Sequence, residues 1–108
     1  EIFAVAGLWE KWKSPIGDLI FSFTLLTQVP NLKLSAIHDR MPAILLPEDE
    51  KKWLDKTISD EEAMDCINPL PDEFTDVYRV SKRVNNVREN DADLILPVAE
   101  NDDLLTLF

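Results

Sequence analysis

Two apolar segments near the start of the chain can pair as a β-hairpin, and this pairing constrains the fold more than any other feature. Residues 2–9 are almost continuously apolar, a pattern typical of a strand buried on both faces. Residues 19–26 alternate instead, with Phe21 and Phe23 on one face and hydroxyl side chains on the other. Residues 14–18 between them have turn chemistry, because Pro fixes one φ angle and Gly permits a positive one. The sequence therefore predicts a hairpin whose first strand is central in a sheet.

Two helices are marked in the middle of the chain. Pro47 is a favoured first helical residue, and the acidic residues after it suit the positive end of the helix dipole. Trp53 and Leu54 are expected to form the buried stripe of this helix. A second helix should begin at Ser59, where Ser-Asp-Glu-Glu has the pattern of a capping box, and should end before Pro69.

The remaining elements are shorter, and together they indicate the fold class. Residues 43–46 and 74–80 are each expected to form a strand, whereas residues 27–35 form a connector broken by Pro30. Strands and helices mix without a regular strand-helix-strand alternation, which indicates an α+β fold. The 108 residues fit one small domain, and 45% hydrophobic residues are enough for a core.

Several kinds of site are excluded by the residue types present. One cysteine cannot form an internal disulfide, and one cysteine with one histidine cannot complete a tetrahedral zinc site. Gly7 and Gly17 are too far apart for a phosphate-binding loop. The acidic run at residues 48–50 has no further suitably spaced ligand, so a solvated helix turn explains it better than a cation site. We therefore expect no metal and no cofactor.

The charge of the chain bears on its partners. The formal net charge of -10 should repel nucleic acid and anionic membrane, and it allows an acidic interaction module or a DNA mimic that occupies the basic site of another protein. The charge is uneven, because acidic and basic residues balance in residues 1–42 and the whole excess lies in residues 43–108. No apolar run approaches the roughly 18 residues of a membrane span, and no leader pattern is present. We expect a cytoplasmic protein without a membrane partner.

The strongest candidate for chemistry is the segment around His38, the only side chain with an ordinary pKa near neutrality. In an extended segment His38 and Arg40 would face one side and Asp39 the other. That arrangement would place a proton-transfer group beside a phosphate or carboxylate clamp. The alternative is a loop histidine that caps a backbone carbonyl, with the arginine paired to one of many carboxylates.

Other reactive or aromatic residues have a structural interpretation. Cys66 could be a nucleophile with His38 as its base, but it falls on the apolar stripe of a helix and is expected to act as a small hydrophobic residue. Trp9 and Trp53 are expected to pack in the core. Trp12, which lies between two lysines, is the tryptophan with a plausible exposed role.

One group of motifs in the chain is specific when taken together. His-x-Arg-Met-Pro at residues 38–42 is followed by a late Val-Asn-Asn at residues 84–86. Further segments in the same order are residues 3–10, 22–27, 37–46, 47–54 and 80–81. This order of motifs resembles the C-terminal part of the SRAP family, the SOS-response-associated peptidase-like proteins that shield abasic sites in single-stranded DNA.

The resemblance implies a covalent mechanism whose nucleophile is not in this sequence. Family members begin Met-Cys, remove the Met autocatalytically, and use the cysteine thiolate and α-amine to close a thiazolidine crosslink with the ring-opened abasic sugar. An Asn and a Glu assist from the first part of the domain. Gly7-Leu8-Trp9-Glu10 resembles the motif of that Glu, but its spacing to His38 fits a separate downstream segment of the family. Glu10 is therefore not expected to be the catalytic acid.

The resemblance also implies roles for three residues of this chain. His38 matches the histidine that assists sugar ring opening and proton transfer, Arg40 matches a DNA-phosphate contact, and Thr27 matches a position near the DNA backbone. The implied fold is α+β, with a mixed, largely antiparallel, barrel-like β core and flanking helices. The implied partner is single-stranded DNA with abasic sites, and the implied location is the cytoplasm with nucleoid association on DNA damage.

The start of the sequence bears on its extent. The first residue is Glu, and an apolar segment follows at once. We expect residues 1–108 to be the C-terminal part of a single SRAP-type domain whose N-terminal part, with the catalytic Cys, lies in a longer protein. A catalytically inactive remnant kept for its structure remains an alternative.

Overall fold

The computed structural model describes residues 1–99, which divide into two compact units. Unit 1 covers residues 1–75, and unit 2 begins at Asp76. In unit 1 the strands are β1 (Ala4–Val5), β2 (Gly7–Lys13), β3 (Leu19–Leu25), β4 (Thr27–Gln28), β5 (Met41–Pro42) and β6 (Ile44–Leu45). The helices are α1 (Leu32–Ser35), α2 (Pro47–Trp53), α3 (Asp60–Met64) and a 3-10 turn, η1 (Asp72–Phe74). Unit 2 contains two 3-10 turns, η2 (Lys82–Asn85) and η3 (Ala92–Ile95).

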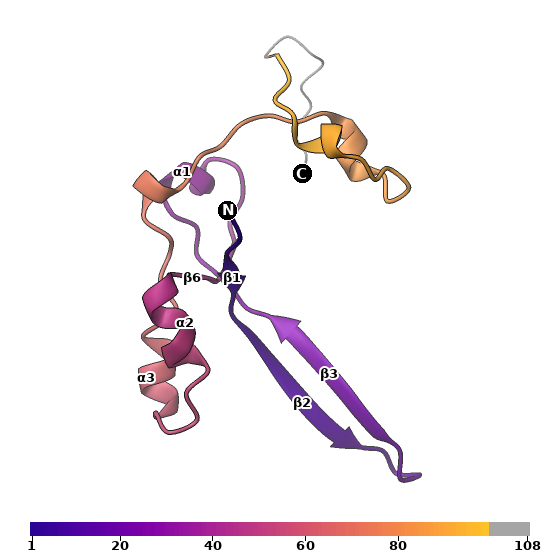
Figure 1. The fold of residues 1–108 in the computed structure, drawn as a ribbon, viewed down its shortest axis with the longest axis vertical. Coiled ribbons are helices and arrows are strands. Elements are labelled where there is room, and N and C mark those ends of the chain that lie inside the picture. The colour runs from indigo at the N-terminus through magenta and orange to yellow at the C-terminus, as the bar shows by residue number, and fades with distance from the viewer. Residues whose placement is uncertain (100–108) are drawn as a thin grey trace. The chain divides into compact units, whose positions relative to one another are not determined.

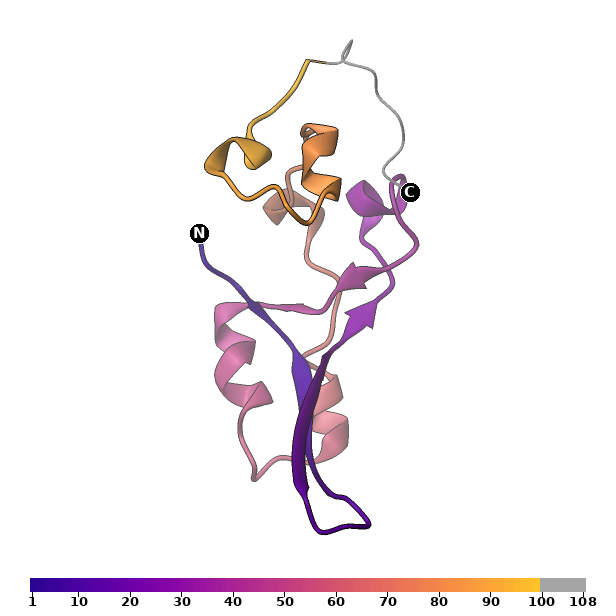
Figure 2. The same cartoon turned by 90° about the vertical axis from the view of Figure 1, so that its right-hand side faces the viewer.

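The predicted hairpin is confirmed as the longest pairing in unit 1. β2 and β3 pair antiparallel from Gly7 opposite Leu25 to Lys13 opposite Leu19. The turn closes through a 2.7 Å bond from the Ser14 N–H to the Asp18 carbonyl, and Gly17 takes the positive φ of 93° that the sequence predicts. Figure 1 shows the two strands running away from α2 and α3, and Figure 2 shows the turn at the far end of unit 1 from α1.

The prediction of a central strand buried on both faces over residues 2–9 is wrong. Residues 4–5 form β1 and pair with β6, Ala6 interrupts the strand, and β2 starts at Gly7. Beyond Ala6 the side chains are exposed, so that Trp9, expected in the core, has 72% of its surface accessible. The reason is that β2 pairs with β3 alone in the described structure. Within unit 1, no second sheet or helix layer packs against the faces of this two-stranded arm, so its side chains stay exposed.

The strands of unit 1 form three two-stranded antiparallel sheets, β1–β6, β2–β3 and β4–β5. Backbone bonds tie the three together where Ala6, Leu26 and Ala43 meet: Ala6 N–H donates to Ala43 O at 2.8 Å, Leu26 N–H to Ala6 O at 2.9 Å and Ala43 N–H to Leu26 O at 3.0 Å. The α+β class with largely antiparallel pairing is confirmed. Within residues 1–99 the sheets do not close into a barrel.

The core of unit 1 lies at this junction. Its buried members are Ala6, Ala43, Leu45 and Cys66, with Ala4, Leu26, Trp53 and Ile67 packed against them. Trp53 therefore reaches the core, as the sequence predicts. Leu54 does not, because α2 ends at Trp53 and the next residue is 77% exposed.

Both predicted helix starts are confirmed. Pro47 opens α2 with acidic residues in its first turn. The Ser59 hydroxyl accepts the Glu62 N–H at 3.1 Å and caps α3. No helix in the described part of the chain is long and apolar enough to cross a membrane.

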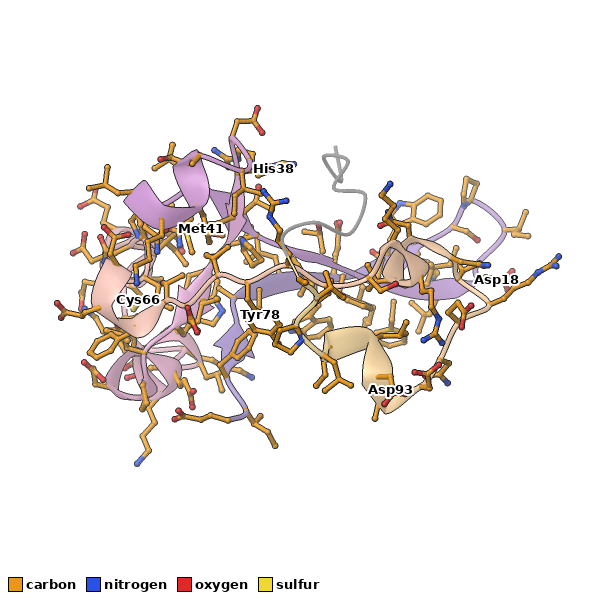
Figure 3. The ribbon with its side chains drawn as sticks, turned by 90° about the horizontal axis from the view of Figure 1, so that it is seen from above. Asp18, His38, Met41, Cys66, Tyr78 and Asp93 are labelled. Atoms are coloured by element: carbon orange, nitrogen blue, oxygen red, sulfur yellow. The ribbon has the colours of Figure 1, made fainter. Side chains whose placement is uncertain are left out.

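The predicted strand over residues 74–80 is wrong. η1 ends at Phe74, and the pairing seen further on is an isolated bridge between Val80 and Pro97 in unit 2. Within unit 2 the Tyr78 hydroxyl donates to the Ile95 carbonyl at 2.9 Å. Tyr78 and Asp93, both in unit 2, are labelled in Figure 3.

Candidate functional site

The site is built where β4 and β5 pair. Thr27 lies opposite Pro42, and Gln28 lies opposite Met41. Arg40 precedes β5 and lies two residues before Pro42, so its long side chain can reach Thr27 diagonally across the pair. Two residues that are distant in the sequence therefore become neighbours through a single short sheet.

The Arg40 side chain is anchored on Thr27. Its Nη2 donates to the Thr27 carbonyl oxygen at 2.7 Å and to the Thr27 hydroxyl oxygen at 3.2 Å. Its Nε donates to the same hydroxyl at 3.2 Å. Both residues are exposed, so this contact orients a cation at the surface and does not bury it. A guanidinium held in one direction can bind an anion with less loss of side-chain entropy than a mobile one.

His38 lies in the loop between α1 and β5, and its Nδ1 faces the backbone of its own loop. The Arg40 N–H donates to Nδ1 at 3.0 Å. Nδ1 also lies 3.1 Å from the Asp39 carboxylate oxygen Oδ1. The hydrogen bond from the Arg40 N–H requires an Nδ1 that carries no proton. The contact with Asp39 becomes an ion pair when the imidazole is protonated. The histidine side chain is 43% accessible, which leaves the imidazole reachable from solvent.

The prediction that Asp39 faces away from His38 is wrong. It assumed an extended segment, but the Ile37 and His38 N–H groups both donate to the Leu34 carbonyl at 2.9 Å, so the chain turns here. In a turn, neighbouring side chains need not alternate, and the Asp39 carboxylate comes to the imidazole. Asp39 is therefore a further member of the site that period-two reasoning missed.

Two buried polar residues hold the site in place. The Asn31 side chain, in a residue only 8% exposed, donates to the Leu70 carbonyl at 2.8 Å and to the Thr75 hydroxyl at 2.9 Å, and it caps α1 through the Leu34 N–H at 3.0 Å. Gln28, 7% exposed, donates to the Asn68 carbonyl at 3.1 Å. These contacts fix both ends of the segment from β4 to α1 against residues 68–75.

Sequence reasoning missed Gln28 and Asn31 because it assigned residues 27–35 to a connector. The local signal was the presence of two amide side chains, Gln28 and Asn31, on the two sides of Pro30. Proline has no N–H to donate, and a nearby amide side chain can hydrogen-bond to backbone groups in its place. The partners are about forty residues away in the chain. A local pattern does not reveal such partners.

Lys33 and Asp72, near the site, are hydrogen-bonded to backbone groups. Lys33 Nζ donates to the Thr75 carbonyl at 2.7 Å, and the Lys33 N–H donates to the Asp72 carboxylate at 3.0 Å. These bonds join α1 to η1. Arg40 is exposed, and its backbone N–H contacts the His38 imidazole while its guanidinium is bonded to Thr27.

The groups whose pKa departs clearly from its ordinary value lie elsewhere. The Thr57 hydroxyl and N–H donate to the Asp55 carboxylate, at 2.7 Å and 2.9 Å, and lower its pKa. In unit 2, hydrogen bonds from Arg83 to Glu89 and Asp91 raise the pKa of the guanidinium. Both arrangements are exposed ion or hydrogen-bond pairs with a structural role.

Cys66 is part of the core. It is 3% exposed, so its predicted burial is confirmed, and its Sγ lies 3.9 Å from the Glu62 carbonyl. The prediction that it lies on the stripe of a helix extending to just before Pro69 is wrong, because α3 ends at Met64 and Cys66 follows it. Figure 3 labels Cys66, Met41 and His38 at the end of unit 1 that is far from Asp18 in the hairpin turn. Trp12 is 50% exposed in β2. In the part of the chain that the structure describes, no three His, Cys, Asp or Glu side chains gather closely enough to hold a metal ion.

Comparison with known proteins gives a consistent picture. The profile of the family described as SOS response associated peptidase (SRAP) matches residues 1–87. The abasic site processing protein YoqW of Bacillus subtilis is 39% identical over 96 residues, which cover 88% of this chain and 43% of that protein. The abasic site processing protein HMCES of Pongo abelii is 39% identical over 101 residues, which cover 91% of this chain and 28% of that protein.

A solved structure is similar along most of the chain. The crystal structure of a protein from Bacteroides thetaiotaomicron matches with a TM-score of 0.75 and 27% identity, covering 90% of this chain and 44% of that one. The chain thus spans less than half the length of these relatives.

Proposed function

The chain belongs to the SOS response associated peptidase (SRAP) family, and on this premise we propose that it supplies part of a site that processes abasic positions in single-stranded DNA. The observation that carries the proposal is the corner formed by His38, Arg40 and Thr27. It presents an accessible imidazole and an oriented guanidinium on one short segment. An imidazole can move a proton near neutral pH, and a guanidinium can bind a phosphate.

Arg40 and Thr27 are proposed to position the DNA backbone. Phosphate contacts fix where a strand lies and carry no base information, which suits a protein that must accept a site with no base. The local charge supports this assignment, because residues 1–42 are neutral overall although the chain carries -10. The acidic residues are concentrated after this segment.

His38 is proposed to transfer protons at the sugar. Ring opening of an abasic deoxyribose moves the proton of the C1′ hydroxyl to the ring oxygen and generates an aldehyde. The α-amine of an N-terminal Cys condenses with this aldehyde, releases one water and forms an imine. The thiol then adds across the imine: sulfur bonds to C1′, the thiol proton goes to nitrogen, and a thiazolidine closes.

The nucleophile of this reaction is proposed to come from polypeptide outside residues 1–108. Cys66, the one cysteine of these residues, is buried in the core. Residues 1–108 are accordingly proposed as the C-terminal part of one SRAP-type domain, and the N-terminal part as its partner. The same part would carry the autopeptidase reaction that exposes the Cys. The proposed place of action is DNA in the cytoplasm, including the nucleoid after damage.

The test uses the full gene product and a single-stranded oligonucleotide with one abasic site. A covalent product that survives a denaturing gel is expected, together with a large loss of its rate of formation in His38→Asn. Asn90→Ala, an exposed polar change in unit 2, is the control and should leave the rate unchanged. A full product that binds a basic protein and forms no DNA adduct would overturn the proposal in favour of an acidic interaction module.

A further inference from the structure

We propose that one face of the β2–β3 hairpin is the docking surface for the N-terminal part of the SRAP domain. The inference rests on the proposed function, in which residues 1–108 are one part of that domain. We call this surface the hairpin face and define it as Trp9, Leu19, Phe21, Phe23 and Leu25, together with Lys11 and Lys13 at its outer end.

The strand register decides which side chains share this face. Residues directly opposite each other in an antiparallel pair point to the same side. Trp9 lies opposite Phe23, and Lys11 lies opposite Phe21. Gly7 opposite Leu25 and Lys13 opposite Leu19 complete the same side. The aromatic residues therefore form one continuous strip along the arm.

The other face of the arm is different. It carries Leu8 opposite Thr24, Glu10 opposite Ser22 and Trp12 opposite Ile20. Polar side chains interrupt the apolar ones there, so this side can meet water more easily. The hairpin is amphipathic, and its aromatic side is the one that requires a partner.

The hairpin face is exposed in unit 1. Phe23 is 78% accessible, Trp9 72% and Phe21 65%. Trp9 and Phe21 stack with ring centroids 6.4 Å apart and an interplanar angle of 24°, which gives the strip a fixed shape. Each large aromatic side chain can bury about 150–250 Å². Several large apolar side chains exposed next to one another mark an interaction site. A two-stranded hairpin alone is also only marginally stable in water.

The relatives indicate what covers this surface. The chain corresponds to 43% of YoqW and 44% of the Bacteroides structure. The similarity in fold extends over 90% of this chain, so in that protein the same architecture lies within a polypeptide more than twice the length of the matched part. The occupant that the structure favours is therefore the rest of the same domain, through an apolar surface that packs on the hairpin face. The outer edges of β2 and β3 also offer unpaired backbone groups to added strands.

The experiment compares the full gene product with the 108-residue chain by amide hydrogen exchange. Amides of residues 7–25 are expected to exchange about tenfold or more slowly in the full product, because docking adds strands and excludes water. In the full product, Phe23→Ser should remove most of this protection. Ile16→Ser is the matched control, since Ile16 is 85% exposed in the hairpin turn and lies outside the face.

Two results would overturn the inference. One is equal exchange of residues 7–25 in both proteins. The other is concentration-dependent dimerisation of the 108-residue chain that protects the hairpin as well as the full product does, which would assign the face to a second copy. The DNA adduct assay is scored separately. If the hairpin amides are protected but no DNA adduct forms, the proposed activity is refuted and the docking surface is supported. If an adduct forms but the hairpin amides are not protected, the docking surface is refuted and the activity is supported.

Discussion

The Arg40 guanidinium donates to both oxygen atoms of Thr27, to the carbonyl at 2.7 Å through Nη2 and to the hydroxyl at 3.2 Å through Nη2 and Nε. The contact uses one edge of a group with five N–H donors. The remaining donors on Nη1 can be offered to a phosphate while the first edge stays on Thr27. This arrangement makes Thr27 a positioning residue for Arg40.

Replacing Arg40 by Ala in the full gene product is expected to weaken binding to single-stranded DNA. The loss of one phosphate contact should reduce the slope of log affinity against log salt by about 0.7. Fluorescence anisotropy over a salt series measures both quantities. Arg88→Ala removes the same charge from an exposed position in unit 2 and should change the slope less. Equal slopes for wild type and Arg40→Ala would refute a phosphate contact.

The neutral imidazole of His38 is expected to carry its proton on Nε2. The reason is the Arg40 N–H, which donates to Nδ1 at 3.0 Å and therefore requires a lone pair there. Because His38 is the only histidine in this chain, two-bond proton–nitrogen NMR spectra of the 108-residue protein will show a single imidazole. A dominant Nδ1–H tautomer at high pH would show that this hydrogen bond is not formed.

Asn31→Ala is expected to destabilise unit 1 by about 1–3 kcal/mol, because it leaves buried backbone and hydroxyl groups without their partners. The Leu70 carbonyl and the Leu34 N–H lose the amide that satisfies them. The urea midpoint measures the effect, and Asn90→Ala, an exposed asparagine, provides the comparison. If both variants unfold at the same midpoint, the Asn31 network does not contribute to stability.

Gly17→Ala is expected to loosen the hairpin through backbone strain alone. A Cβ at this position meets no atom within 4 Å, but the φ of 93° is unfavourable for an L side chain by about 1–2 kcal/mol. Amide exchange of β2 and β3 should become faster in Gly17→Ala and less so in Gly17→Asn, because Asn tolerates positive φ better. Exchange in Gly17→Ala as slow as in the wild type would contradict this.

The features that the sequence predicts correctly depend on neighbours a few residues apart. The hairpin follows from a continuous apolar segment and an alternating one on the two sides of a turn with Pro15 and Gly17, and the α3 start follows from Ser59 and Glu62. Leu54 shows the limit of such patterns: it continues the stripe of α2, but the helix ends one residue earlier and the side chain stays exposed. The prediction of a strand at residues 74–80 is also wrong, because a strand needs a pairing partner that its own sequence does not specify.

What the sequence by itself determined is the chemistry available: one imidazole, the His-x-Arg spacing, the hairpin turn and the two helix starts. The tertiary structure alone decided which of these groups meet. It brought Thr27 to Arg40 through the pairing of β4 with β5, turned Asp39 toward His38, and anchored α1 on Asn31 through partners about forty residues away. It also left the aromatic side of the hairpin exposed, where the apolar pattern had predicted burial. The physical reason is that propensity and spacing act within a few residues, whereas burial and contact depend on which distant segments are present to pack.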